Sequence, residues 1–313
     1  MNISYSGPLS HGWDRMKKAL FQPFDISKWI NVGFTAFLAG LTDCNGGRGG
    51  NNSNIRNHHD WDDFFSFPQT AWNWLTDHPL WFNLIILGVI LLFIIGIVFT
   101  WLSSRGKFMF LYNVIHDRDD VKKPWYEFKK QGNSLFWWRF IFGWLAFFAF
   151  IAYFVFCFIT VKNMYYGDIP IGPKVWMIAG LVLLFLVLII IVGYISLFLN
   201  DFVVPIMYKH KIGAIRAWLK FLPLMGRHLG TFIVYGLFIF VLGIAVAVGV
   251  IFLALVTCCI GLLLLAIPFV GSVIFLPVSY TFRALSIEFL KQFGDDFNVF
   301  PPQESPAPAE SNI

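Results

Sequence analysis

The chain has 313 residues, of which 58% are hydrophobic and only 13% are charged, and its formal net charge is +5. Soluble domains carry about 25% charged residues, so this composition excludes an ordinary soluble domain and indicates a polytopic membrane protein. A mean hydropathy of +0.68 agrees. The positive charge is therefore interpreted loop by loop, and we expect no nucleic-acid partner.

Near the N-terminus, residues 9–24 predict an amphipathic helix. Trp13 and Leu20 recur at helical spacing, whereas Arg15 and Lys18 occupy other faces of the helix. A basic face opposite Trp and Leu is typical of a helix that lies on an anionic membrane surface.

The clearest membrane span lies between Trp81 and Trp101. The nineteen residues between them carry no charge, and fifteen are Leu, Ile, Val or Phe. As a helix this stretch covers ~30 Å, the thickness of the hydrocarbon core of a bilayer. Tryptophan at each end suits the two headgroup layers.

The same criteria predict six spans along the chain. The first is the weakest, because its apolar part, residues 29–41, would be only ~20 Å long as a helix. Residues 228–282 contain no Asp, Glu, Lys or Arg, which predicts two spans with a turn near Cys258 and Cys259. The predicted spans are residues 25–44, 81–104, 135–161, 176–200, 230–256 and 261–282.

The predicted fold class is therefore an all-α membrane protein with six transmembrane helices as three hairpins and cytosolic amphipathic interfacial helices. Residues 1–293 form the membrane domain, and residues 294–313 predict a disordered acidic, Pro-rich tail. Six spans place 19 of the 23 basic residues on one side, so we expect an inner-membrane protein with both termini cytosolic. The basic residues expected outside are Arg48, Arg56, Lys162 and Lys174.

Two more surface helices are predicted, within residues 108–132 and over residues 212–222. Aligning Trp125 with Trp218 also pairs Phe128 with Phe221, which favours a parallel repeat of one basic helix and two spans. The alternative is that any hairpin membrane protein with positive inner loops has this pattern. The predicted membrane-interface residues are Trp13, Trp81, Trp101, Trp125, Trp218, Arg216 and Lys220.

The segment from Pro23 to Leu38 (PFDISKWINVGFTAFL) follows a Trp-bearing basic helix and precedes a Gly/Asn-rich loop. In this arrangement the chain resembles a bacterial family of polytopic inner-membrane proteins of unknown function. Its later organisation is similar to the membrane domain that accompanies some glycerophosphodiester phosphodiesterases. The resemblance implies a fold and a bacterial inner membrane, and it carries no active site.

Candidate chemistry is sparse. A cluster of potential metal ligands follows the Gly/Asn run, but adjacent residues rarely converge on one ion, so a solvated loop is the favoured interpretation. Its residues are His58, His59, Asp60, Asp62 and Asp63, with His78 further on. Asn200 and Asp201 are predicted to end the fourth span, and Arg283 to anchor the sixth.

No span has a central charge, and the chain contains no Walker, GxSxG or HExxH motif. We therefore expect no catalytic, cofactor-binding or metal-binding residues. The predicted function is a non-catalytic structural, assembly or lipid-contacting module of the membrane. The alternatives are a transporter or channel for a neutral or lipid-like solute and, less favoured, an intramembrane lipid enzyme. Expected partners are membrane lipids and another membrane protein or a second copy of the chain.

The predicted topology places residues 45–80 outside the cytoplasm. A periplasmic reporter enzyme fused near Asn52 is expected to be active, because the first span carries this loop across the membrane. Activity of a cytosolic reporter at the same site, with the periplasmic one inactive, would contradict the topology.

Overall fold

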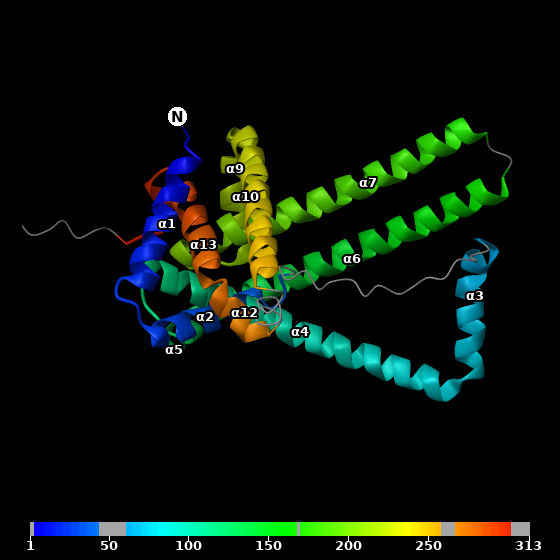
Figure 1. The fold of residues 1–313 in the computed structure, drawn as a ribbon, viewed down its shortest axis with the longest axis horizontal. Coiled ribbons are helices and arrows are strands. Elements are labelled where there is room, and N and C mark those ends of the chain that lie inside the picture. The colour runs from blue at the N-terminus through cyan, green and yellow to red at the C-terminus, as the bar shows by residue number, and fades with distance from the viewer. Residues whose placement is uncertain (1–2, 44–60, 168–169, 258–266, 302–313) are drawn as a thin grey trace, which may run out of the picture. The chain divides into compact units, whose positions relative to one another are not determined.

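The computed structural model describes residues 3–43, 61–167, 170–257 and 267–301, in which all regular elements are helices (Figure 1). The predicted all-α class is confirmed for this part of the chain. The chain divides into two compact units. Unit 1 comprises residues 1–42, 101–138 and 194–313, and unit 2 comprises residues 43–100 and 139–193.

The described residues form the following helical elements in chain order. They are α1 (Ser6–Phe21), α2 (Ile26–Gly40), α3 (Trp61–Asp77), α4 (Pro79–His116), α5 (Lys122–Glu127), α6 (Lys129–Tyr166), α7 (Ile171–Phe198), a π-helical turn η1 (Leu199–Val203), α8 (Val204–His210), α9 (Ala214–Arg227), α10 (Leu229–Val256), α12 (Pro268–Ile274), α13 (Leu276–Lys291) and a 3-10 turn η2 (Asp295–Phe297).

Four helices are long and apolar enough to cross a membrane: Pro79–His116, Lys129–Tyr166, Ile171–His210 and Leu229–Val256. They correspond to the second to fifth predicted spans, and by length and composition they indicate a multi-pass membrane protein. The first three extend well beyond their predicted bounds, because each helix continues past its apolar stretch. Six spans are not shown in the described part of the chain.

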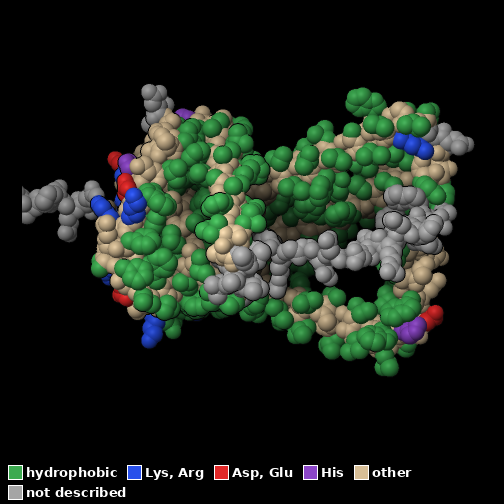
Figure 2. Space-filling model, viewed as in Figure 1, with side chains coloured by type: hydrophobic (Ala, Val, Ile, Leu, Met, Phe, Trp, Pro, Cys, Tyr) green, Lys and Arg blue, Asp and Glu red, His purple; other side chains and the backbone are tan. Residues whose placement is uncertain are grey.

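Unit 2 presents apolar side chains to its surroundings, as the green surfaces of Figure 2 show. Leu92 of α4, Phe148 of α6 and Leu183 of α7 are all exposed. Such a continuous apolar surface is unstable in water and is typical of helices that face lipid. Inside the unit, the Tyr153 hydroxyl of α6 donates a hydrogen bond to the Leu181 carbonyl of α7 at 3.0 Å.

Unit 1 is built around the C-terminal part of α4. Every residue from Ser103 to Ile115 is buried, so this part of the helix is enclosed on all sides. Helices α1 and α13 lie side by side in the same unit (Figure 1). They approach closely at Gly12, where an added Cβ would lie 3.1 Å from the Leu285 backbone nitrogen.

The surface helix predicted within residues 108–132 is found only in part, as the short helix α5 at Lys122–Glu127. Residues 108–116 continue α4 and are largely buried, and α5 is only six residues long. The dense charge that suggested a surface helix lies in the connection between α4 and α5, and the apolar residues before it pack in the core instead. Phe128 and Phe221, paired in the proposed repeat, are both buried.

The first and sixth predicted spans are represented by shorter helices. Helix α2 has 15 residues, or ~22 Å. The described part of residues 261–282 forms α12 and the start of α13, because Pro277 stands at the first positions of a new helix rather than kinking one. Helices α2 and α12 pack together, with Gly33 against Val273. Cys258 and Cys259, the predicted turn, lie outside the described residues.

The predicted loop and tail also contain ordered structure. Within residues 45–80, helix α3 occupies Trp61–Asp77 and packs Phe65 against Phe158 of α6, with ring centroids 5.7 Å apart. At the other end, Val299 and Phe300 are buried in unit 1. The predicted tail therefore includes a packed segment at residues 295–301.

A close backbone contact between α2 and α4 generates a stability prediction. A Cβ at Gly106 of α4 would lie 2.6 Å from the Ala39 nitrogen and from the Leu38 carbonyl carbon of α2. Because backbone atoms cannot move aside cheaply, Gly106→Ala is expected to lower the free energy of unfolding by roughly 1–3 kcal/mol. Thermal unfolding of the protein in detergent measures the change.

Gly96 is the matched control, since it lies in the same helix with no atom within 4 Å of an added Cβ. Gly96→Ala is expected to be neutral or stabilising by up to about 1 kcal/mol through helix propensity. Equal melting temperatures for the two variants would refute the close contact.

Candidate functional site

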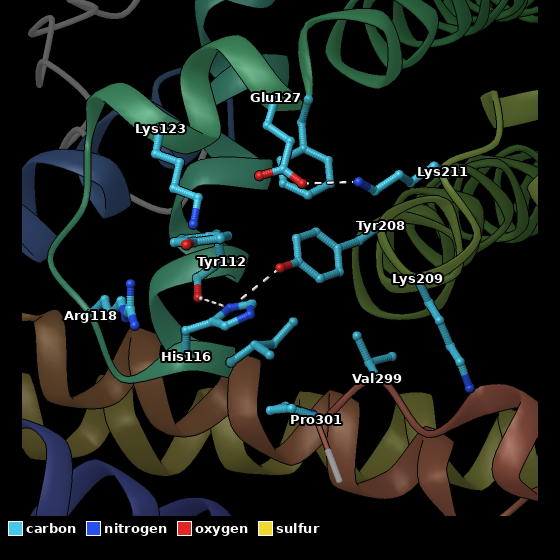
Figure 3. A pocket seen from close by; sticks show the side chains of 12 residues that line it. Tyr112, His116, Arg118, Lys123, Glu127, Tyr208, Lys209, Lys211, Val299 and Pro301 are labelled. Atoms are coloured by element: carbon cyan, nitrogen blue, oxygen red, sulfur yellow. Dashed lines mark hydrogen bonds and ion pairs between the residues drawn. The ribbon is translucent and has the colours of Figure 1, made fainter.

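An open pocket of about 350 Å³ lies in unit 1, where α4 and α8 end and α5 begins (Figure 3). Its lining combines cations with aromatic rings. The cations are Arg118, Lys123, Lys209 and Lys211, and the aromatic rings are Tyr112, His116, Phe128 and Tyr208. Such a combination can bind an anion whose organic part needs an apolar contact.

Two stacked ring pairs form the pocket wall. Tyr112 and His116, one turn apart on α4, have centroids 4.4 Å apart, and Phe128 and Tyr208 have centroids 4.5 Å apart. The Tyr208 hydroxyl lies 3.4 Å from Nδ1 of His116 and joins the two pairs. The rings are therefore held in place by packing before any ligand arrives.

The charges around the pocket are not balanced. Glu127 is the only carboxylate among the described lining residues, and Lys211 is bound to it at 3.0 Å. Lys209 donates to the backbone carbonyl of Asp295. Lys123 has no carboxylate partner among the described residues, and its ammonium lies 5.6 Å from the centroid of the Tyr112 ring. The pocket therefore has an excess of positive charge.

The segment 295–301 forms the remaining wall through Val299 and Pro301. It is held by Asp296, whose carboxylate lies 2.7 Å from Nζ of Lys220, and by the Arg15 guanidinium, 3.6 Å from the centroid of the Phe300 ring. The hydrogen bond from Lys220 holds the pKa of Asp296 below its usual value.

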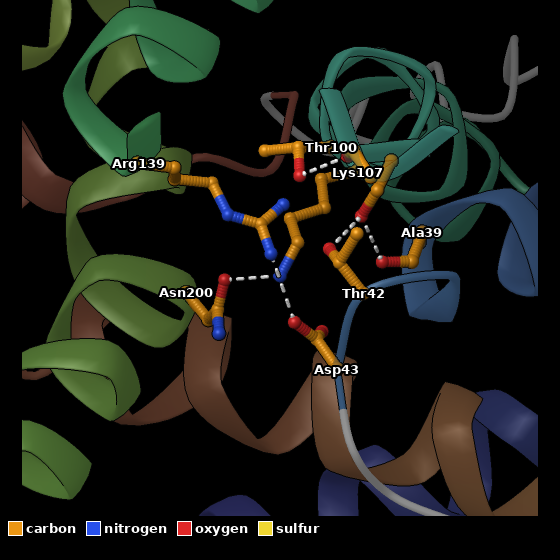
Figure 4. Close-up of polar contacts among 9 residues, drawn as sticks. Ala39, Thr42, Asp43, Thr100, Lys107, Arg139 and Asn200 are labelled. Atoms are coloured by element: carbon orange, nitrogen blue, oxygen red, sulfur yellow. Dashed lines mark hydrogen bonds and ion pairs between the residues drawn. The ribbon is translucent and has the colours of Figure 1, made fainter. Parts of the chain in front are cut away.

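A buried polar network lies in unit 1, at the π-helical turn. Lys107 of α4 is 1% exposed and donates to the Asn200 side-chain oxygen (Figure 4). Arg283 of α13 donates to the Asn200 carbonyl at 2.6 Å, and the Tyr235 hydroxyl of α10 donates to Asp201 at 2.9 Å. Four segments of the chain thus meet at one turn, and π turns inside helices often mark functional positions.

The network corrects the two predictions for these residues. Asn200 and Asp201 do not lie at a helix end, since the helix continues through the π turn to His210. Arg283 is not a free anchor at a helix end, because its guanidinium is engaged by Asn200 in the core. The burial of Lys107 is not evident from the sequence, since its neighbours do not indicate that α4 continues past Trp101.

Three of the predicted interface residues are exposed. Trp13 lies on the outer side of α1, Trp81 near the start of α4 in unit 2, and Arg216 on α9. Lys220 is engaged instead, through its ion pair with Asp296 at 2.7 Å. Its role is therefore to hold the C-terminal segment as well as to add positive charge.

The other three tryptophans pack against protein. Trp101 and Trp125 lie on the Arg105 guanidinium, with ring centroids 4.4 and 4.8 Å from its central carbon. Trp218 stacks on Trp138 of α6 at 5.5 Å. Such cation–π and stacking contacts orient the connections between the long helices.

The pocket was not foreseen from sequence. Tyr112, His116 and Tyr208 lie in stretches with no motif, and only folding brings α4, α5 and α8 together. Of the potential metal ligands that were interpreted as a solvated loop, His58, His59 and Asp60 lie outside the described residues. Within the described part of the chain, no group of three or more His, Cys, Asp or Glu residues could hold a metal ion.

Comparison with known proteins places the chain in a family. The pattern of a family of unknown function, DUF7544, matches residues 8–290, so the chain belongs to this family. This confirms the expected membership of a family of unknown function over most of the chain. No curated protein and no solved structure matches the chain.

The anchoring of segment 295–301 can be tested through Asp296. Because its pKa is lowered in the folded protein, its ion pair is present above the usual carboxyl pKa and is lost as the pH falls through the lowered value. At neutral pH, Lys220→Ala should speed hydrogen exchange at the amides of residues 297–300 by up to about fivefold, as expected for an exposed ion pair. Mass spectrometry of exchanged peptides measures this.

Arg216→Ala is the control, because it removes the same charge from an exposed position of the same helix. It should leave exchange in this segment unchanged. If both variants exchange alike, Asp296 does not hold the segment.

Proposed function

We propose that this member of the DUF7544 family is a non-catalytic inner-membrane protein whose basic end contacts anionic lipid. One observation supports this most directly, the exposed side of α9. Ile215 is 70% exposed, Leu219 64% and Leu222 43%, whereas Ala217 and Phe221 on the opposite side are fully buried. The helix therefore turns three large aliphatic side chains outward.

The exposed apolar surface of α9 is suited to contact with lipid. Arg216 stands beside the aliphatic stripe, and a basic residue near an anionic membrane surface contributes roughly 1 kcal/mol to binding. Helix α10, a candidate span, begins at Leu229, two residues after α9 ends, and its own Leu229 and Ile233 are exposed. The apolar surface of α9 thus leads directly into that of a membrane-crossing helix.

The same reasoning supports six crossings with both termini in the cytosol. Helix α10 starts with Tyr235 buried in unit 1 and runs to Val256, whereas α13 returns to the unit 1 core at Leu276. With α10 proposed to cross the membrane, the return to the unit 1 core at Leu276 supports a further crossing before α13. Helix α2 packs on Gly106, ~40 Å along α4 from its start at Pro79, and this distance supports a further crossing before α4.

The proposal assigns membrane lipids as partners, with another membrane protein or a second copy as further candidates. It assigns no catalytic role, because the sequence carries no catalytic motif. The likeness to the membrane domain that accompanies glycerophosphodiester phosphodiesterases fits a module that contacts lipid without chemistry of its own. Assignment to a bacterial inner membrane rests on that resemblance and on the charge distribution.

A transporter of a neutral or lipid-like solute is the second candidate. It is favoured by the π turn and its buried network, since Lys107 and Asp201 lie on helices long enough to span a membrane. Ionisable residues in such helices often mark a transport pathway. Solute uptake by proteoliposomes would distinguish a transporter from a lipid-contacting module.

The position of α9 can be measured in the whole protein. A spin label at position 219, in full-length protein reconstituted into anionic vesicles after replacement of the native cysteines, should collide more often with oxygen than with a water-soluble nickel chelate. The reason is that Leu219 is expected to lie among acyl chains.

A label at position 211 is the control, since Lys211 is exposed in the connection before α9 and should be reached by the chelate. Equal access of the chelate to both positions would remove the support for a lipid-facing α9 and with it the proposed function.

A further inference from the structure

We infer that the pocket of Figure 3 binds the phosphate ester of an anionic ligand, and that Lys123 is the cation on which its affinity depends most. The inference deepens the proposed function by naming the chemical group that this end of the protein recognises. A volume of about 350 Å³ lies at the lower end of the ~300–1,000 Å³ range of small-molecule sites. The pocket is thus the size of a headgroup or a small sugar phosphate.

The first argument is uncompensated charge. Of the four lining cations, only Lys211 has a close carboxylate, Glu127 at 3.0 Å. Arg118 lies 4.0 Å from an exposed Asp120, a distance at which an exposed pair contributes little. Lys123 has no carboxylate partner in the described part of the chain. An anion entering the pocket therefore finds cations whose charge is still available.

The second argument is the placement of Lys123. Cations in the last turn of α8, such as Lys209, are explained by the negative end of the helix dipole. Lys123 lies in the first turn of α5, where the helix dipole does not stabilise a positive charge. Its side chain nevertheless extends towards the Tyr112 ring and the pocket interior (Figure 3). A bound anion accounts for this placement.

The third argument is the set of donors around the aromatic wall. The Tyr208 hydroxyl points into the pocket towards His116 (Figure 3), and the Arg118 guanidinium and Lys123 ammonium lie on the far side of it. Phosphate oxygens accept charge-assisted hydrogen bonds from such groups, and the stacked rings supply apolar contact for the alcohol part of the ester. A metal cation is disfavoured, because the only lining carboxylate is already engaged by Lys211.

The phosphate ester can come from a lipid or from the cytosol. The pocket lies at the end of α4 and α8, which belong to candidate spans, and basic pockets in this position bind anionic headgroups in other membrane proteins. A soluble phosphomonoester presents the same group. The experiment therefore uses both: phosphatidic acid, retained by the protein in native mass spectrometry, and glycerol 3-phosphate, titrated calorimetrically into protein in phosphatidylcholine nanodiscs.

Lys123→Gln in the full-length protein should weaken binding of the probe by about five- to tenfold, corresponding to the loss of one charge-assisted contact. Lys122→Gln is the matched control, because it removes the same charge from the neighbouring exposed residue, which does not line the pocket. Glu127→Gln should tighten binding by about threefold, since it releases Lys211. A purely structural role of these residues would not weaken binding in one variant and tighten it in the other.

Retention of phosphatidic acid alone identifies a headgroup site, and binding of glycerol 3-phosphate identifies a soluble ester; either supports the phosphate site if Lys123→Gln weakens it. Equal losses of affinity in Lys122→Gln and Lys123→Gln would show that the probe is attracted by the overall positive charge, and would overturn the inference. Absence of binding of both probes would overturn it as well. A Leu219→Gln variant separates this result from the proposed function, because it should disturb lipid contact by α9 and leave binding of glycerol 3-phosphate intact.

Discussion

The burial of Lys107 is the constraint on which the rest of unit 1 depends. A buried ammonium is costly unless it is hydrogen-bonded, and removing one partner of such a group is strongly destabilising. Asn200 supplies the acceptor, and the same residue accepts from Arg283 through its carbonyl. The π turn makes this possible, since it interrupts the regular helix where its carbonyls would otherwise bond internally. Helices α4 and α13 are thereby both connected to the π turn η1.

The geometry of the pocket depends on these hydrogen bonds at Asn200. Tyr112 and His116 stand less than three turns beyond Lys107 on α4, and Tyr208 and Lys209 follow the π turn on α8. The helices hold Tyr112, His116 and Tyr208 at fixed distances from Lys107 and Asn200, and the contact between Tyr208 and His116 joins the two ring pairs. The C-terminal segment then closes one side through the Lys220–Asp296 ion pair. A deeply buried network and an open basic site are therefore parts of one arrangement.

The sequence predictions are confirmed for features that lie within a single helix. The Trp81–Trp101 stretch could be identified because nineteen uncharged residues have few alternatives to a membrane-crossing helix. The aliphatic stripe of α9 could be read from its spacing. The extent of α4 could not, because residues 103–115 include Arg105, Lys107 and Asn113, which suggest a surface unless their partners are known. Those partners lie on other helices, up to ninety-three residues away along the chain.

The sequence by itself determined the helical class, the four long apolar helices, the concentration of basic residues in particular connections and the amphipathic character of α1 and α9. These are local properties, since hydropathy, helical spacing and charge are read within one or two dozen residues. Only the tertiary structure decided that Lys107 is buried, that Asn200 and Asp201 lie in a turn within a continuous helix, and that Lys123 faces a pocket with Tyr112 and Tyr208. Each of these depends on contacts between segments far apart in the chain, and the hydrogen bonds and ring contacts that hold them leave no periodic trace in any one segment.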